Sequence, residues 1–169
     1  MGWTRRQVLA GVAAAGGLAT AGGIGVVGSW WDRTPAEGLR ALSEEEYALV
    51  QAVGEAWAPP GGEPAMSGAE ANVGAYVDLL AERMAPTQKK AFKLLLNGLN
   101  AASLPTHGAR FVALDLSSRT SLLASWMASD NFLIRQAVSA VTVLVALAWS
   151  EHPEVARTFA PLFRCGFGR

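Results

Sequence analysis

Apolar side chains return every three to four residues along much of this 169-residue chain, and proline or glycine separates one such stretch from the next. One set precedes Pro59 and consists of Tyr47, Val50, Val53 and Trp57. This spacing places the apolar residues on one face of a helix. Strands instead alternate with a period of two, and no convincing alternation of that kind occurs. We therefore expect an all-α protein, a small bundle of about five helices preceded by an N-terminal signal or anchor helix.

Capping and helix-breaking residues indicate where the expected helices begin and end. Ser43, followed three residues later by Glu46, predicts a capping box, and Pro59 stops the helix that this box opens. Segment 103–108 is expected to be a loop. Trp57, Trp126 and Trp149 are expected in the core or at an interface. The further helices are expected at about 68–85, after Pro86, from about 117, at about 132–150, and as a short amphipathic piece after 153.

The last long helix has an unusual composition. Its stretch from Ala137 to Trp149 is apolar almost all round, which predicts a buried central helix. That stretch is shorter than the roughly 20 residues that a membrane span needs.

Three lysines gather in the helix expected after Pro86. The apolar stripe of that helix consists of Phe92, Leu95, Leu96 and Leu99, and the three lysines and Asn97 are expected to lie largely away from it. The lysines are Lys89, Lys90 and Lys93. Such a cluster is a solvated face or a docking patch, and a solvated face is the commoner case.

The first 31 residues differ in composition from the rest. Arg5 and Arg6 precede a run without charged side chains, which extends from Gln7 to Trp31 and is rich in Gly and Ala. A positive segment before an apolar one is the layout of an export signal, and the arginine pair is typical of the twin-arginine variant. The expected division of the chain is a signal or signal anchor over 1–31, a linker over 32–42 and a helical accessory domain over 43–169.

The sequence is compatible both with cleavage of this signal and with its retention as a membrane anchor. The small-x-small site Ala19-Thr20-Ala21 lies inside the apolar run rather than after it. The run is also long enough to span a bilayer, which takes about 20 residues. Trp30 and Trp31 stand where interfacial aromatic residues anchor a membrane helix. We therefore expect a periplasmic protein that is either processed or held at the inner membrane by an uncleaved signal.

Few residues are available for a catalytic or metal centre. The single cysteine, Cys165, excludes an internal disulfide framework, a Cys-only iron–sulfur centre and a haem attached through Cys-x-x-Cys-His. His107 lies in a loop with Pro105 and Gly108, and His152 lies beside Pro153, which ends a helix. Residues 23–28 match the G-x-G-x-x-G pattern of dinucleotide-binding sites, which needs a strand before the glycines and a helix after them. Here a Gly/Ala run precedes the glycines and Pro35 follows too soon for such a helix, so the match is a chance one. We expect no catalytic, cofactor-binding or metal-binding residues in this chain.

The remaining features concern partners. Cys165, next to Arg164, is expected to be a free surface or interface thiol, or to form an intermolecular disulfide. The 14 acidic side chains balance the 14 basic ones, which leaves no strong field to attract DNA or RNA. We therefore expect no nucleic-acid partner.

The order of these motifs resembles a known family. An arginine-pair signal leads to Leu42-Ser43-Glu44-Glu45-Glu46, then to Phe111-Val112-Ala113-Leu114, and a long apolar helix closes on Trp149-Ser150-Glu151-His152-Pro153. This layout is similar to the small subunit of membrane-bound gluconate 2-dehydrogenase, called subunit 3. Related small subunits accompany glucose, fructose, sorbitol and glucoside 3-dehydrogenases. The ending departs from the family's Gly-Tyr-x-Gly-like pattern, since Cys165-Gly166-Phe167-Gly168 stands there instead.

The resemblance implies an accessory role. Such a small subunit binds a large FAD-dependent flavoprotein of the glucose–methanol–choline class, assists its folding and carries it through the twin-arginine translocase. Only Arg5 and Arg6 carry over as motif residues with a mechanism. A multihaem cytochrome c often completes the complex, so the resemblance implies FAD in the partner, haem c in a third subunit and no cofactor in this chain. The alternative is a membrane-anchored helical binding module of another periplasmic complex.

Overall fold

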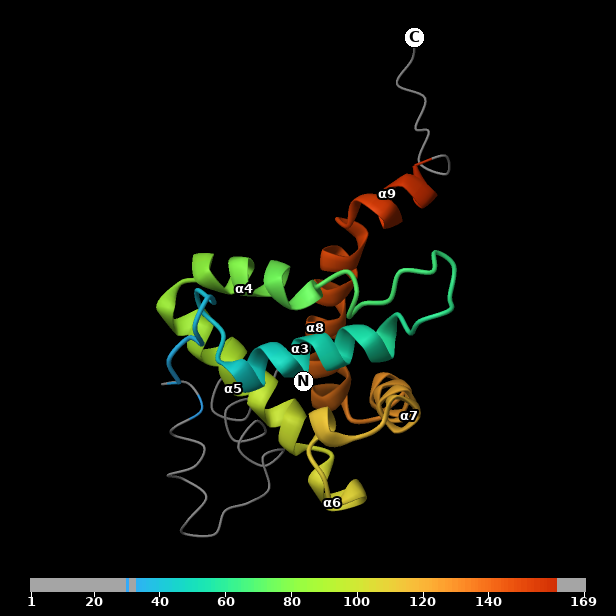
Figure 1. Cartoon of the computed structure of the whole chain (residues 1–169). Coiled ribbons are helices and arrows are strands. Elements are labelled where there is room, and N and C mark those ends of the chain that lie inside the picture. Colours follow the sequence, from blue (N-terminus) through green and yellow to red (C-terminus); the bar gives the residue numbers. More distant parts are fainter. Residues whose placement is uncertain (1–29, 31–32, 161–169) are drawn as a thin grey trace, which may run out of the picture.

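The computed structural model describes residue 30 and residues 33–160, and over that part of the chain every regular element is a helix (Figure 1). The longer helices there are α3 (Glu44–Trp57), α4 (Val73–Arg83), α5 (Pro86–Ala101), α7 (Leu116–Met127) and α8 (Phe132–Ser150). The shorter ones are α6 (Leu104–His107), the 3-10 helix η1 (Phe111–Ala113) and α9 (Pro153–Phe159). The prediction of an all-α bundle is confirmed. The expected signal helix lies outside the described residues except for Trp30.

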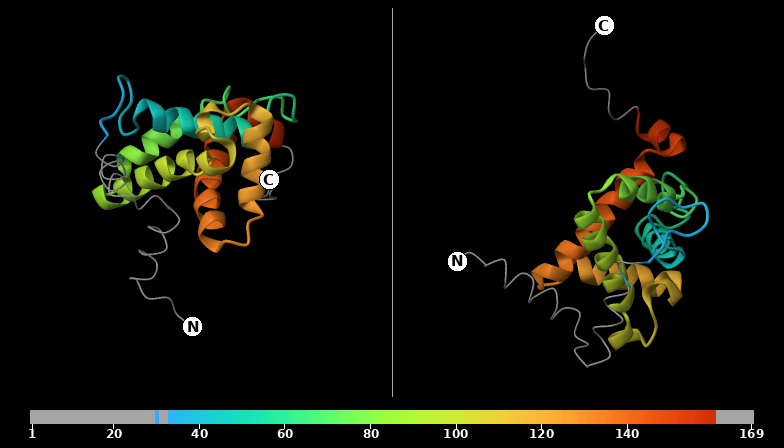
Figure 2. Two further views of the ribbon diagram at one scale, coloured as in Figure 1. Left: turned by 90° about the horizontal axis from the view of Figure 1, so that it is seen from below. Right: turned by 90° about the vertical axis from the view of Figure 1, so that its left-hand side faces the viewer.

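Two helices organise the bundle. α3 packs against α4, α5, α7 and α8, and α8 in turn packs against α4, α5, α7 and α9. In Figure 1 α8 passes behind α3 at a steep angle, and Figure 2 shows α7 and α8 side by side as a hairpin. The core lies between these helices, and its fully buried side chains include Leu49, Val50, Leu96, Val141 and Val145.

Side-chain caps open three of the longer helices, α3, α7 and α8. The N–H of Glu46 donates to Ser43 Oγ, and the N–H of Ser43 donates to Glu46 Oε2 at 2.8 Å, which forms the predicted capping box. Asp115 accepts from the N–H of Ser118 at the start of α7, and Asn131 accepts from the first N–H groups of α8. Each cap satisfies donors that a helix leaves free in its first turn.

Two expected boundaries are wrong. The helix expected over 68–85 begins only at Val73, because a turn precedes it and Asn72 adopts a left-handed conformation with φ of 52°. The segment 103–108, expected to be a loop, contains the helical turn α6. Pro105 does not interrupt this turn, since a proline near a helix start lacks only an N–H that the helix leaves unused.

A close backbone crossing joins α3 to the loop before α4. A Cβ atom on Gly68 would lie 2.1 Å from the carbonyl oxygen of Gly54, and one on Gly54 would lie 2.5 Å from Val73 Cγ2. Any larger side chain at position 68 would force the two segments apart. The two glycines therefore set the approach of α4 to α3.

The segment 33–42, expected to be part of a linker, is packed on the bundle. Asp78 on α4 accepts the backbone N–H groups of Arg40, Ala41 and Leu42 at 2.8, 2.9 and 2.8 Å. Burial raises the pKa of Asp78, but these three donors outweigh it and hold the pKa below its ordinary value. Ala41 and Leu42 are themselves buried in the core. The ionised carboxylate thus ties the segment that precedes α3 to α4.

Candidate functional site

The two histidines lie on different elements and make local contacts. His107 belongs to α6 and His152 precedes α9, and these elements lie at opposite ends of the molecule in Figure 1. His107 Nδ1 lies 2.8 Å from Thr106 Oγ1, and His152 Nδ1 accepts from the N–H of Glu154 as the cap of α9. Within residues 33–160 and residue 30, no group of three or more His, Cys, Asp or Glu side chains is placed to hold a metal ion.

A buried polar cluster joins α3, α5 and the segment before α3. Lys93 Nζ lies 3.4 Å from Glu46 Oε2 and donates to the carbonyl oxygen of Arg33 at 2.8 Å. Asn97 Nδ2 donates to Glu46 Oε1 at 2.9 Å. The side chains of Lys93 and Glu46 are only 4% and 1% exposed. The expectation that Lys93 and Asn97 lie on a solvated face is therefore wrong.

Charge compensation explains why Lys93 and Asn97 are buried rather than solvated. Phe92, Leu96 and Leu99 of the expected apolar stripe are buried, but Leu95 is only half-buried because the buried face of α5 is rotated toward Lys93. A buried carboxylate such as that of Glu46 needs a cation and hydrogen-bond donors. Apolar spacing alone carries no information about such a partner. The cluster uses its own polar groups to hold three segments together.

The expected core tryptophans lie at the margin of the core. Trp57 and Trp149 meet edge to face with ring centroids 5.6 Å apart, and Trp149 Nε1 donates to the carbonyl oxygen of Met66 at 2.8 Å. Trp126 stacks on the fully buried Phe111. All three indoles are half-buried. Each indole therefore packs against the core and keeps part of its surface exposed.

The most distinctive surface of the described part of the chain is one face of α8. Phe132, Gln136, Ala140, Val143 and Leu147 follow one another at intervals of three or four residues and therefore share a helix face. All five are exposed, with Phe132 at 61%, Val143 at 56% and Leu147 at 49%. We call this row the exposed α8 face. Apart from one amide, it presents only apolar groups, as surfaces covered by another molecule do.

The expected burial of α8 is therefore correct on one side only. Val138, Val141, Thr142, Val145 and Ala148 are buried against the other helices. A helix that is apolar all round needs neighbours on every side, and so small a bundle supplies them on one side. Among the described helices, α8 alone is long and apolar enough to cross a membrane. Core helices of soluble proteins can meet the same criterion of length and composition. α8 packs against α3, α4, α5 and α7 on one side only.

Most of the residues assigned to export, membrane anchoring or an intermolecular disulfide lie outside the described residues. These are Arg5, Arg6, Trp31 and Cys165. Trp30 is described, and it is helical and half-buried. The roles assigned to these residues stay predictions. The exposed α8 face was missed because periodicity cannot show which side of an apolar helix has a neighbour.

One comparison with known proteins is informative. The family model described as "Gluconate 2-dehydrogenase subunit 3" matches residues 44–158. The matched range begins with α3, contains the whole of α8 and ends within α9. No curated protein and no solved structure matches the chain.

Proposed function

The chain belongs to the gluconate 2-dehydrogenase subunit 3 family, and on that premise we propose that it is the non-catalytic small subunit of an exported dehydrogenase complex. Its partner in this proposal is a large FAD-dependent flavoprotein of the glucose–methanol–choline class, which oxidises a sugar or an alcohol. The small subunit binds this flavoprotein, assists its folding and carries it through the twin-arginine translocase. The FAD belongs to the partner, and haem c belongs to a third subunit, a multihaem cytochrome c.

The exposed α8 face is the observation that supports this docking role. It lies within the residues that the family model matches, and it presents Phe132, Val143 and Leu147 to solvent when the chain is alone. Full burial of a large apolar side chain contributes roughly 1.5–3 kcal/mol, and covering the exposed half of each of these contributes about half of that. α8 is also anchored in the bundle by its opposite side. A rigid apolar row of this kind suits a stable subunit contact, since little ordering is required on binding.

The export role rests on Arg5 and Arg6, and a conservative substitution tests it. Replacing both by Lys keeps the positive charge but removes the guanidinium pair. We expect the chain and its flavin-bearing companion to accumulate in the cytoplasm. The measurement is an immunoblot for both proteins, together with flavin absorbance, on the cytoplasmic and periplasmic fractions of the cells. The control is Arg157→Lys, an equally conservative change at an exposed position of α9.

The outcomes separate clearly. Retention of the flavoprotein in the cytoplasm by the Arg5→Lys/Arg6→Lys variant, with the control exported normally, supports carriage by this chain. Normal appearance of the flavoprotein in the periplasm of the double variant contradicts it.

A further inference from the structure

The exposed α8 face has no cover among the residues that the structure describes, and the uncleaved chain carries a second apolar stretch. Residues 7–31 contain no charged side chain and are rich in Gly and Ala. Apolar surfaces of this size associate in water, because association removes them from contact with the solvent. A chain that waits in the cytoplasm for the twin-arginine translocase bears both surfaces at once, so each is available to cover the other.

The chain before residue 30 is long enough for this contact. The exposed α8 face rises from Phe132 to Leu147 and is therefore about 22 Å long. Residues 7–29 measure about 35 Å as a helix and about 75 Å when extended. A domain of the size of the described part has a radius of gyration of about 14 Å. The length of this segment therefore suffices both to reach the face and to run along it.

A fixed attachment point strengthens such a contact. The carbonyl oxygen of Arg33 accepts from Lys93 Nζ at 2.8 Å, and the side chain of Arg33 pairs with Glu45. The chain therefore enters the bundle at a defined position beside α3 and α5. Tethering of this kind gives the two surfaces an effective concentration in the millimolar range, so that even a weak contact is populated.

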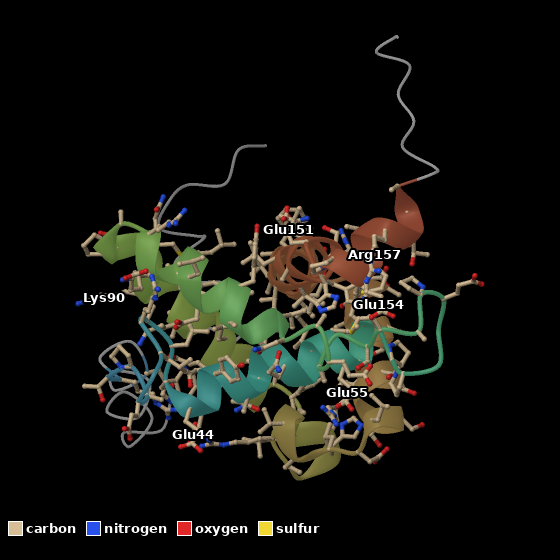
Figure 3. All side chains as sticks on the ribbon, turned by 45° about the horizontal axis from the view of Figure 1, so that its top comes forward. Glu44, Glu55, Lys90, Glu151, Glu154 and Arg157 are labelled. Carbon is tan, nitrogen blue, oxygen red and sulfur yellow. The ribbon has the colours of Figure 1, made fainter. Side chains whose placement is uncertain are left out.

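The two stretches are also complementary in charge. Glu151 follows Leu147 by one helical turn, is exposed, and lies at the end of α8 on the side away from α3 in Figure 3. None of the ion pairs among residues 33–160 includes Glu151. Arg5 and Arg6 precede the apolar run. An apolar row that ends in a carboxylate thus matches an apolar run that ends in guanidinium groups, which bind carboxylates in a bidentate manner.

We propose that segment 5–29 of the uncleaved chain lies on the exposed α8 face until the flavoprotein displaces it. The face holds one occupant at a time, so binding of the flavoprotein releases the segment by mass action. Arg5 and Arg6 then become available to the translocase only after the complex has assembled. The contact between segment 5–29 and the face needs no partner, whereas its release rests on the docking role proposed above.

The test is photo-cross-linking of the full, uncleaved chain, produced in cells that lack the twin-arginine translocase and the flavoprotein, and kept in detergent-free buffer. Benzoylphenylalanine is introduced at position 143 on the face and, as the matched control, at position 104, an exposed apolar position on α6. Mass spectrometry of the digested monomer identifies the attached peptide. Circular dichroism verifies that each variant is folded.

We expect a cross-link within one molecule from position 143 to segment 5–29, and none to that segment from position 104. Glu151→Gln should lower the yield about two- to fivefold, as loss of an exposed ion pair does. Glu63→Gln, at an exposed position in the loop before α4, should leave the yield unchanged. Absence of a cross-link from position 143 to segment 5–29, or a cross-link only between two copies of the chain, overturns the proposal.

Addition of the purified flavoprotein tests the release. Saturating flavoprotein should lower the cross-link to segment 5–29 at least about tenfold and replace it by a cross-link to the flavoprotein. A cross-link to the flavoprotein beside an unchanged cross-link to the segment overturns the release. Failure of the docking role gives a different result, because position 143 then cross-links to segment 5–29 but never to the flavoprotein.

Discussion

Lys93 Nζ lies 3.4 Å from Glu46 Oε2, and both side chains are almost completely buried. Residues from two helices thereby form an ion pair in the interior, supported by Asn97 and by the carbonyl oxygen of Arg33. A buried pair adds little net stability compared with apolar residues, but loss of one partner leaves an uncompensated charge. The pair therefore makes the packing of α5 on α3 sensitive to single substitutions.

The first prediction follows from that asymmetry. Lys93→Met leaves the Glu46 carboxylate buried without its cation and is expected to lower the free energy of unfolding by about 3–5 kcal/mol. Adding Glu46→Gln removes the uncompensated charge and keeps an oxygen that accepts from Asn97, so the double variant should regain part of the loss. Urea unfolding followed by circular dichroism measures both. If the double variant lost as much unfolding free energy as Lys93→Met and Glu46→Gln lose separately, added together, the two residues would not be coupled.

The second prediction concerns pH. The pKa of Asp78 is lowered in the folded protein because three backbone N–H donors outweigh the effect of burial. A lowered folded-state pKa stabilises the fold above the unfolded pKa of about 3.9, and this contribution is lost as pH falls through the folded value. Asp78→Asn should therefore be less stable than the wild type near pH 7, with the difference shrinking below about pH 4. Urea unfolding at a series of pH values measures this difference.

The control for that experiment is Asp130→Asn, at an exposed position in the turn between α7 and α8. Because the position is exposed, this substitution should change the unfolding free energy by less than about 0.5 kcal/mol. If the Asp78→Asn difference were the same at pH 3 and pH 7, the link between the carboxylate and the segment 40–42 would be incorrect.

The third prediction compares two glycines. Gly68→Ala places a methyl group against the backbone of Gly54 and should cost about 1–3 kcal/mol or more, with a lower melting temperature. Gly98 lies inside α5, and a Cβ there would meet nothing within 4 Å. Gly98→Ala should therefore raise stability by about 0.5–1 kcal/mol through the entropy of the unfolded chain. Equal effects of the two substitutions would contradict the close crossing of α3 with the loop before α4.

The fourth prediction concerns the exposed α8 face. Val143→Glu/Leu147→Glu adds two charges to the row and should abolish association with the partner flavoprotein, because a charge inside an apolar contact is not compensated. Fold stability should change by less than about 1 kcal/mol, since both positions are exposed. The measurement is the flavin absorbance recovered per mole of tagged chain after affinity purification.

Leu104→Glu serves as the control for this face, because Leu104 is an exposed apolar residue on α6 rather than on α8. It should retain the normal amount of flavin. Full flavin recovery with the α8 double variant, or equal loss with Leu104→Glu, would place the partner contact elsewhere.

Sequence reasoning was most successful where the signal is local. The capping box of Ser43 and Glu46 and the limits of α8 follow from neighbouring residues, and the structure confirms both. It was least successful for Lys93, whose burial depends on Glu46, a residue 47 positions earlier in the chain. The exposed α8 face shows the same limit, since exposure depends on which helices surround α8. Local patterns predict elements, whereas partners across the fold decide which polar groups are buried and which apolar groups are not.

We propose that this chain is an accessory subunit of a flavin dehydrogenase. The most direct test is gentle purification of the tagged full chain from its own host, followed by an absorbance spectrum and the masses of all copurifying proteins. We expect a companion of flavoprotein size that carries bound flavin, with or without the absorption bands of haem c. A colourless, monodisperse chain without a companion would contradict the accessory role.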